Sequence, residues 1–168
     1  MKYIHNNTIY DNKIDVIPDG ATELTSDQYE ILSNPPSSYH KWNGTEWVPD
    51  TSRKQEILAK LEALINAATD QTILSGFSYN GHNFKLSLEN QINYKTECEL
   101  RENLTYPHKI KTIDGYYEMQ DASEYLAMYL AAVAFIRQAI ETGWAQKDAI
   151  QNKTTTELIE MLRGYETP

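Results

Sequence analysis

The sequence lacks most of the features that mark exported, membrane-spanning or redox-active proteins. Its 1 cysteine, Cys98, cannot form a disulfide within the chain, and the surrounding glutamates disfavour a reactive thiolate, so we expect a structural residue. The longest apolar run, Tyr125 to Ile136, is far shorter than the ~20 residues that cross a bilayer. The first residues lack the apolar stretch of a signal peptide, and we expect a protein of the reducing cytoplasm.

Positive charge is also scarce. The sequence has 15 lysines and arginines against 24 aspartates and glutamates, which gives a net charge of −9. Phosphate backbones and anionic membranes attract cationic surfaces, so we expect neither nucleic acid nor a membrane as a partner. Lys109 and Lys111 are too few to form a basic patch of the kind that binds nucleic acids.

No residues have the spacing of a catalytic, cofactor-binding or metal site. The 7 glycines are scattered among turns and form no phosphate-binding loop. Glu97, Glu99 and Glu102 fit a solvated, partly paired helix surface better than an acid–base pair. No two histidines have the i, i+4 spacing of a helical zinc site, and we expect solvated hairpin residues at His5, His40, His82 and His108. The sequence thus predicts no cofactor, no metal and no enzymatic activity.

What the sequence does contain is three Asn-Gly or Asp-Gly pairs, each set between aromatic or β-branched residues. They occupy positions 43–44, 80–81 and 114–115. A two-residue type I′ turn needs positive φ at both central residues, and these dipeptides supply it at the least steric cost. Each pair therefore predicts a tight β-hairpin.

For two of these hairpins the turn determines the register. The second pair places Phe77 opposite Phe84 in its hairpin. The third pairs Lys111 with Glu118, whose charges attract each other across the strands. It also places four residues on one face: Ile110, Thr112, Tyr117 and Met119.

The first hairpin admits two registers. A two-residue loop pairs Lys41 with Glu46, which is electrostatically favourable. A four-residue loop instead places Trp42 directly opposite Trp47. The sequence leaves both open.

Helices separate the hairpins. Two capping boxes, Thr25 with Gln28 and Ser52 with Gln55, each predict the beginning of a helix. Ser87 begins another helix after the second hairpin. Apolar residues recur at helical spacing after the second box, at Ile57, Leu58, Leu61, Leu64, Ile65 and Ala68.

The longest helix is expected over residues 122–143, with Asp121 and Glu124 as its cap. Apolar residues occupy more than one stripe of this helix, so it is either the buried central element or it meets a partner chain. On this ground we expect a homo-oligomer. A last amphipathic helix begins at Thr154 and ends at Gly164.

These elements together predict an α+β fold in which helices alternate with short antiparallel β-hairpins. A small β-rich N-terminal zone precedes them. We place the boundary after Asp50, so that residues 1–50 form an attachment region and residues 51–168 form a helix-hairpin-helix-hairpin-helix domain.

Five aromatic residues are candidates for binding another protein: Tyr39, Trp42, Trp47, Tyr116 and Tyr117. Trp and Tyr rings both dock on proteins and stack on sugars. The alternative for the two tryptophans is that they fill a small core under their hairpin, because so small a hairpin needs cross-strand packing. The two adjacent tyrosines lie in one strand, so one of them must point outward.

Two segments resemble families of bacteriophage proteins. Residues 17–29, IPDGATELTSDQY, followed by WNGTEW at 42–47, resemble the beginning of short tail fibre assembly proteins. Those proteins begin with a Pro-Gly turn, a helix start and a tryptophan hairpin. Residues 76–84, GFSYNGHNF, and the sequence that follows up to the helix at Tyr125 are similar to a domain of unknown function common in phage tail proteins.

The resemblance implies a tail fibre assembly factor or chaperone of a phage, prophage or tailocin. Such a protein contacts the fibre or another tail protein in the host bacterial cytoplasm, and it has no catalytic residues to transfer. The alternative is a structural or receptor-binding component that stays in the virion tail. In that role Trp42, Trp47 or Tyr39 would contact a host surface glycan.

Overall fold

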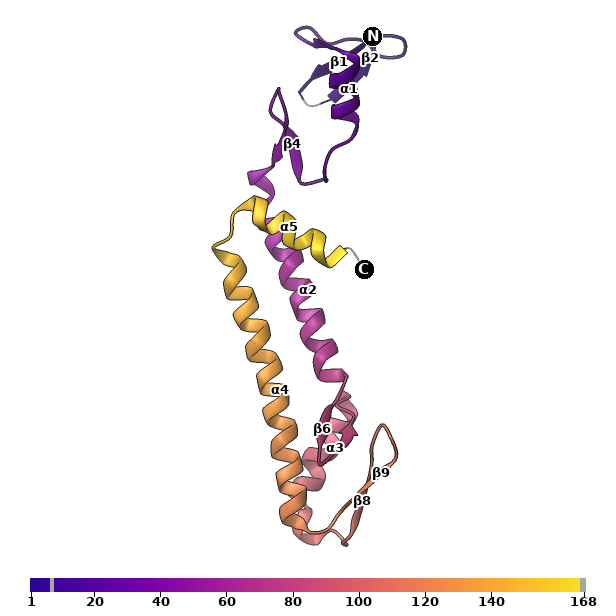
Figure 1. Ribbon diagram of the computed structural model, residues 1–168, viewed down its shortest axis with the longest axis vertical. Coiled ribbons are helices and arrows are strands. Elements are labelled where there is room, and N and C mark those ends of the chain that lie inside the picture. The colour runs from indigo at the N-terminus through magenta and orange to yellow at the C-terminus, as the bar shows by residue number, and fades with distance from the viewer. Residues whose placement is uncertain (7, 167–168) are drawn as a thin grey trace. The chain divides into compact units, whose positions relative to one another are not determined.

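The computed structural model describes the chain apart from residue 7 and residues 167–168 (Figure 1). It divides into two compact units, residues 1–60 with 153–168 and residues 61–152. Within the described residues, helices alternate with short antiparallel strand pairs, and N-terminal strands precede them. The predicted α+β class is confirmed.

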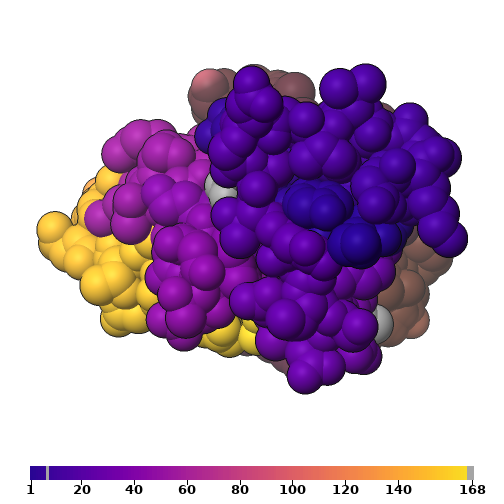
Figure 2. Space-filling model, turned by 90° about the horizontal axis from the view of Figure 1, so that it is seen from above, coloured from indigo at the N-terminus to yellow at the C-terminus, as the bar shows by residue number. Residues whose placement is uncertain are grey.

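The first unit begins with a three-stranded antiparallel sheet in the order β2-β1-β3. Its elements are β1 (Lys2–His5), β2 (Thr8–Asp11), β3 (Thr22–Leu24), α1 (Ser26–Ser33), β4 (His40–Trp42), β5 (Trp47–Pro49), the 3₁₀ turn η1 (Thr51–Arg53), the beginning of α2 (Lys54–Leu74) and α5 (Thr155–Glu166). Seen from above, the side chains of the N-terminal zone form one continuous surface (Figure 2).

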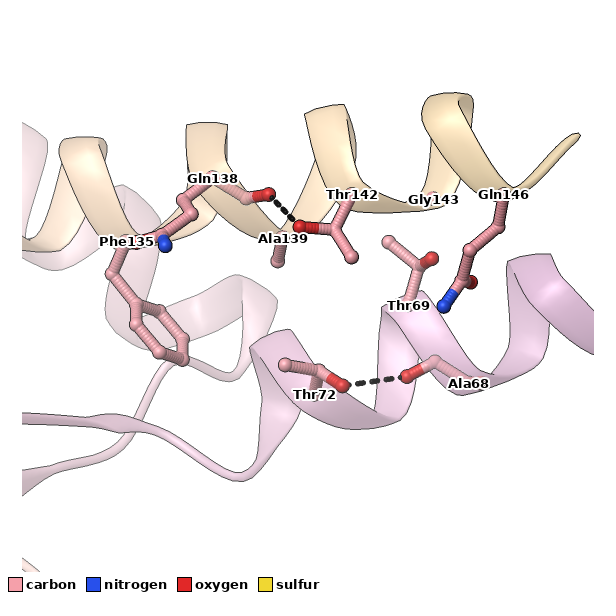
Figure 3. A pocket seen from close by; sticks show the side chains of 9 residues that line it. All are labelled: Ala68, Thr69, Thr72, Phe135, Gln138, Ala139, Thr142, Gly143 and Gln146. Carbon is pink, nitrogen blue, oxygen red and sulfur yellow. Dashed lines mark hydrogen bonds between the residues drawn. The ribbon is translucent and has the colours of Figure 1, made fainter. Parts of the chain in front are cut away.

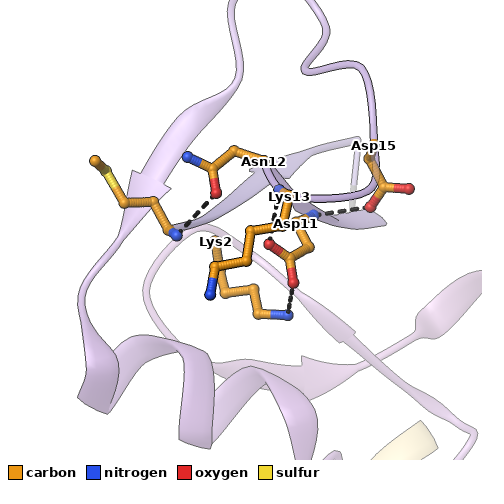
Figure 4. A network of polar contacts seen from close by, with 6 residues as sticks. Lys2, Asp11, Asn12, Lys13 and Asp15 are labelled. Carbon is orange, nitrogen blue, oxygen red and sulfur yellow. Dashed lines mark hydrogen bonds and ion pairs between the residues drawn. The ribbon is translucent and has the colours of Figure 1, made fainter.

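Polar contacts hold the turn that follows β2, next to the beginning of β1 (Figure 4). Lys2 lies opposite Asp11, and its Nζ is 2.8 Å from the Asp11 carboxylate. The Asp11 carboxylate also accepts from the Lys13 backbone N–H at 3.0 Å, and the Asp11 N–H donates to Asp15 at 2.8 Å. The hydrogen bond from Lys2 lowers the pKa of Asp11, so this carboxylate stays ionised in the folded chain.

The β4–β5 hairpin adopts the register that places Trp42 opposite Trp47. The Asn43 side chain decides between the two candidate loops, because its Oδ1 accepts from the backbone N–H groups of Thr45 and Glu46, each at 2.9 Å. These bonds hold a four-residue loop and leave positive φ only at Gly44 among these loop residues. The tryptophan rings then meet edge to face, with centroids 5.8 Å apart.

Two of the three helix caps predicted for the first unit are present in the structure. Thr25 and Gln28 form the predicted capping box at α1. Thr154 and Glu157 form another at α5, although that helix runs through Gly164 to Glu166 and does not end at the glycine. The predicted box of Ser52 with Gln55 is wrong. The Asp50 carboxylate accepts from the Ser52 N–H at 3.2 Å and from its hydroxyl at 2.8 Å, and α2 begins only after the short turn η1.

The second unit contains two hairpins and three helices, of which α2 enters from the first unit. Its other elements are β6 (Phe77–Tyr79), β7 (His82–Phe84), α3 (Leu88–Glu99), the 3₁₀ turn η2 (Arg101–Asn103), β8 (His108–Lys111), β9 (Tyr116–Met119) and α4 (Ala122–Gln151). Ser87 caps α3 as predicted, and Asp121 caps α4. The long helix continues to Gln151, eight residues past its predicted end at Gly143.

A single core joins the hairpins and helices of the second unit. Phe84, Met119 and Tyr125 are each 0% exposed, and they come from β7, β9 and α4. The predicted pairing of Phe77 with Phe84 is confirmed, with ring centroids 5.5 Å apart. Cys98 is buried in this core, as expected of a structural residue.

The register of the β8–β9 hairpin differs from the prediction by two residues. Lys111 lies opposite Tyr116, and Glu118 lies opposite Lys109. The loop spans Thr112 to Gly115 rather than the Asp-Gly pair alone, and the Thr112 N–H donates to the Gly115 carbonyl at 3.0 Å. A shift by two keeps every side chain on its own face, so the buried face remains the predicted one.

Two glycines at or beside the β6–β7 hairpin both have positive φ, but only one of them lacks room for a Cβ. Gly76 has φ +92°, and a Cβ there would lie 2.2 Å from the Phe84 carbonyl oxygen; Gly81 has φ +78° and open space around it. We predict that Gly81→Ala lowers the free energy of unfolding by about 1 kcal/mol, from the left-handed backbone alone. Gly76→Ala adds the backbone clash and costs at least about 3 kcal/mol. Urea denaturation followed by circular dichroism measures both, and equal losses would contradict the packing described for Gly76.

Candidate protein-binding surfaces

The β8–β9 hairpin has an anchored base. Ile110 and Met119 are buried in the core of the second unit, and Thr112 is buried beside them. The Ile113 N–H donates to the Asn83 carbonyl at 2.7 Å, which ties the loop of this hairpin to β7. The hairpin is thus held from its base to its loop by neighbouring elements.

Tyr117 faces inward from this hairpin. Its hydroxyl donates to the Glu124 carboxylate and accepts from the Asn80 side-chain amide at 2.9 Å. Its ring centroid lies 5.0 Å from that of His82. The Asn80 bond lowers the pKa of Tyr117, but the bond to Glu124 and burial outweigh it and raise this pKa overall. Tyr117 is therefore a neutral hydrogen-bond donor that fastens β9 to the beginning of α4.

Tyr116 faces outward and is 58% exposed, which confirms that one of the two adjacent tyrosines points to solvent. The Lys111 ammonium lies 4.4 Å from its ring centroid and the Lys109 ammonium 5.1 Å. Ile113, at the loop, is 51% exposed. We call Tyr116, Lys109, Lys111 and Ile113 the hairpin surface. It offers an aromatic ring, an aliphatic side chain and two cations, of which Lys109 is paired with the Glu118 carboxylate of the same face at 3.6 Å.

The other three candidate residues are packed inside the first unit. Tyr39 and Trp42 are each 9% exposed. The Trp47 indole N–H donates to the Ile31 carbonyl at 2.8 Å, which fastens the hairpin to α1. The Arg53 guanidinium lies 4.6 Å from the Tyr39 ring centroid. Tyr39, Trp42 and Trp47 thus gather around one hairpin, whereas Tyr116 and Tyr117 belong to the other unit.

A buried tyrosine, a carboxylate and a histidine meet where α3, β8 and α4 pack. The Tyr125 hydroxyl donates to Glu97 at 2.7 Å, and His108 Nε2 lies 3.2 Å from the same carboxylate oxygen. Burial and the bond to Glu97 raise the pKa of Tyr125. This contact corrects the expectation of solvated residues at Glu97 and His108. The sequence spacing carried no signal for it, because the three residues are far apart along the chain.

A hollow of about 320 Å³ lies between α2 and α4, which run side by side in the second unit (Figure 3). The Thr72 hydroxyl donates to the Ala68 carbonyl at 2.9 Å, and the Thr142 hydroxyl donates to the Gln138 carbonyl at 2.8 Å. These hydroxyls are therefore engaged within their own helices. A Cβ at position 143 would lie 2.5 Å from the Thr69 hydroxyl oxygen, so the glycine allows the helices to approach closely.

The described residues contain no group of three or more His, Cys, Asp or Glu side chains that could hold a metal ion. Among the same residues, no helix is long and apolar enough to cross a membrane. These two findings concern residues 1–6 and 8–166 alone.

Comparison with known proteins identifies the family. A family model described as a domain of unknown function, DUF4376, matches residues 56–162, and the chain belongs to this family. The match covers most of α2, both hairpins of the second unit, α3, α4 and the larger part of α5. No curated protein and no solved structure matches the chain.

The two adjacent tyrosines of β9 provide a matched test of this geometry. We predict that Tyr117→Phe lowers the free energy of unfolding by about 1 kcal/mol, because the Glu124 carboxylate and the Asn80 amide lose their shared partner. Tyr116→Phe, which removes a hydroxyl from an exposed ring, leaves the stability within about 0.5 kcal/mol of the parent. Urea denaturation measures both values. A larger loss for Tyr116→Phe would mean that the two faces of β9 are assigned the wrong way round.

Proposed function

We propose that this protein is a tail fibre assembly factor of a bacteriophage, a prophage or a tailocin. It acts by contact with the fibre or another tail protein, without catalysis. The resemblance of residues 17–29 and 42–47 to tail fibre assembly proteins supports this proposal. The assembly step takes place in the host bacterial cytoplasm.

The observation that carries the proposal is the hairpin surface. The large ring of Tyr116 is exposed, although the next residue, Tyr117, fastens the same strand to α4 through Glu124. Rigid aromatic residues on a fixed support dominate protein interfaces, because they bury a large area and lose little conformational freedom. Lys111 beside the ring favours a partner surface that carries carboxylates or further aromatic rings, whereas Lys109 is already paired with Glu118.

The first-unit aromatics suit docking less well. Tyr39 and Trp42 are nearly buried, and the Trp47 indole N–H is engaged with α1. A stacking site for a host glycan needs an open aromatic face. We therefore assign fibre contact to the hairpin surface rather than to the tryptophan hairpin.

Co-expression with a tail fibre protein from the same genome tests the proposed function. We expect the fibre to become soluble and trimeric only when this chain is present. A fibre that trimerises equally well alone would contradict an assembly role. Mass spectrometry of purified particles then separates a transient factor, which is absent from them, from a structural component retained in the tail.

Substitutions on the hairpin surface test the assignment of the contact. Tyr116→Ala weakens fibre binding by about 30-fold or more, as expected for a central aromatic residue of an interface. Trp144→Ala is the matched control, because Trp144 is 54% exposed on α4 of the same unit and lies outside the hairpin surface. Surface plasmon resonance with immobilised fibre measures both. Equal loss from the two variants, or none from Tyr116→Ala, would exclude the hairpin surface as the contact.

A further inference from the structure

The second unit has a groove between α3 and α4 that sequence reasoning did not locate. Two hollows of about 360 and 450 Å³ lie along these helices and the end of α2. Both hollows are lined by Leu88, Gln91 and Ile136, so they form one continuous groove. We call it the α3–α4 groove.

The walls of this groove are apolar and open to solvent. Leu88 is 73% exposed, Ile92 64% and Leu74 52%. Val133, on α4, is 43% exposed. Large aliphatic residues that gather around one depression are typical of a surface covered by another protein, because single exposed residues are common and clustered ones are not.

The charged residues of the groove lie at its two ends and have opposite signs. Lys95 lines the hollow that also contains Tyr129, and Asp70 lines the hollow that also contains Ile140. Tyr129 and Ile140 are separated by about 16 Å along α4, from the rise of 1.5 Å per residue. Between the two charged ends the lining is apolar apart from Gln91.

We propose that the α3–α4 groove binds the same groove of a second copy of this chain, across a two-fold axis. Such an axis reverses the direction of the groove, so Lys95 of each copy lies against Asp70 of the other. Leu88, which is shared by the two hollows, lies near the axis and packs against its own symmetry mate. A two-fold interface requires a surface that complements itself, and an apolar middle between ends of opposite charge meets the electrostatic part of this requirement.

The charge pattern favours a second copy over an unrelated partner. Each copy carries a net charge of −9, which opposes association over the molecule as a whole. Within the groove, however, the lining residues contribute one positive and one negative side chain, so two copies meet without net repulsion there. Lys95 also lies 3.8 Å from Glu99 on α3, but both side chains are well exposed, and such a pair is easily exchanged for another.

This inference deepens the proposed function, since a dimer presents two hairpin surfaces to an oligomeric fibre. It is nevertheless tested on the purified full chain without any fibre. Sedimentation equilibrium of the full chain gives the dimer dissociation constant. A chain that remains monomeric at the highest soluble concentration would overturn the groove proposal and leave the fibre contact standing. A monomer whose groove captures the fibre instead would overturn it as well.

Charge exchange supplies the sharpest test of the two-fold arrangement. Lys95→Asp alone places carboxylates together at both ends of the interface, and Asp70→Lys alone places ammonium groups together; each weakens the dimer about 10-fold or more. When the two single variants are mixed, each heterodimer has one native pair and one reversed pair, so association returns. The double variant restores it too. Failure of the mixture to associate better than either variant alone would exclude this pairing.

A further variant tests the apolar middle of the groove. Leu88→Glu buries two carboxylates near the axis and removes two leucines, so the dimer weakens at least about 100-fold. Leu100→Glu is the matched control, because Leu100 is 51% exposed and lines neither hollow of the groove nor the hairpin surface. Circular dichroism confirms that both variants fold. Equal effects of the two substitutions on the dissociation constant would contradict the proposal.

Discussion

The second unit depends on burying one face of each of its two hairpins against α4. A two-stranded hairpin is marginally stable at best in water, and each of these has strands of only three or four residues. The apolar face of the β6–β7 hairpin presents Phe84 to the core, and that of the β8–β9 hairpin presents Met119; both are fully buried. Tyr125 of α4 completes the core from the other side and donates to Glu97 on α3. Because these contacts fix the base of each hairpin, the opposite face of β8–β9 is free to hold an exposed aromatic ring.

The sequence was informative wherever a local rule determined the structure. Side-chain caps at Thr25, Ser87 and Asp121 marked three helix beginnings correctly, because a cap depends on residues within one turn. The register of the β6–β7 hairpin was also correct, since Asn80 has the positive φ that a type I′ turn requires. The domain boundary after Asp50 stays a prediction.

Predictions from the sequence were wrong where residues outside the local motif determined the structure. Asp50 took the capping position instead of Ser52, because its carboxylate is a strong acceptor and binds the N–H and hydroxyl of Ser52 at the beginning of η1. α4 continued past Gly143 to Gln151, and the absence of a Cβ at position 143 leaves room for Thr69 of α2. The observed β8–β9 register differs from the predicted one by two residues. Both registers place the same residues on each face, so the alternation of apolar and polar residues cannot distinguish them. The α3–α4 groove and the contact of Glu97 with His108 and Tyr125 join distant segments, so spacing along the chain gave no sign of either.

The apolar circumference of α4 predicted either a buried central helix or a helix that meets a partner chain, and in the structure one side of α4 is buried while another is exposed. Tyr125, Met128 and Ala132 face the core, whereas Leu130 and Val133 remain 55% and 43% exposed. No charged residue occurs from Tyr125 to Ile136, so this part of the helix cannot cover its apolar stripe with its own side chains. Because these residues stay exposed, the isolated chain gains no free energy from burying them, and a second apolar surface that covered them would gain it. The same helix can therefore support the hairpins on one side and favour association on another.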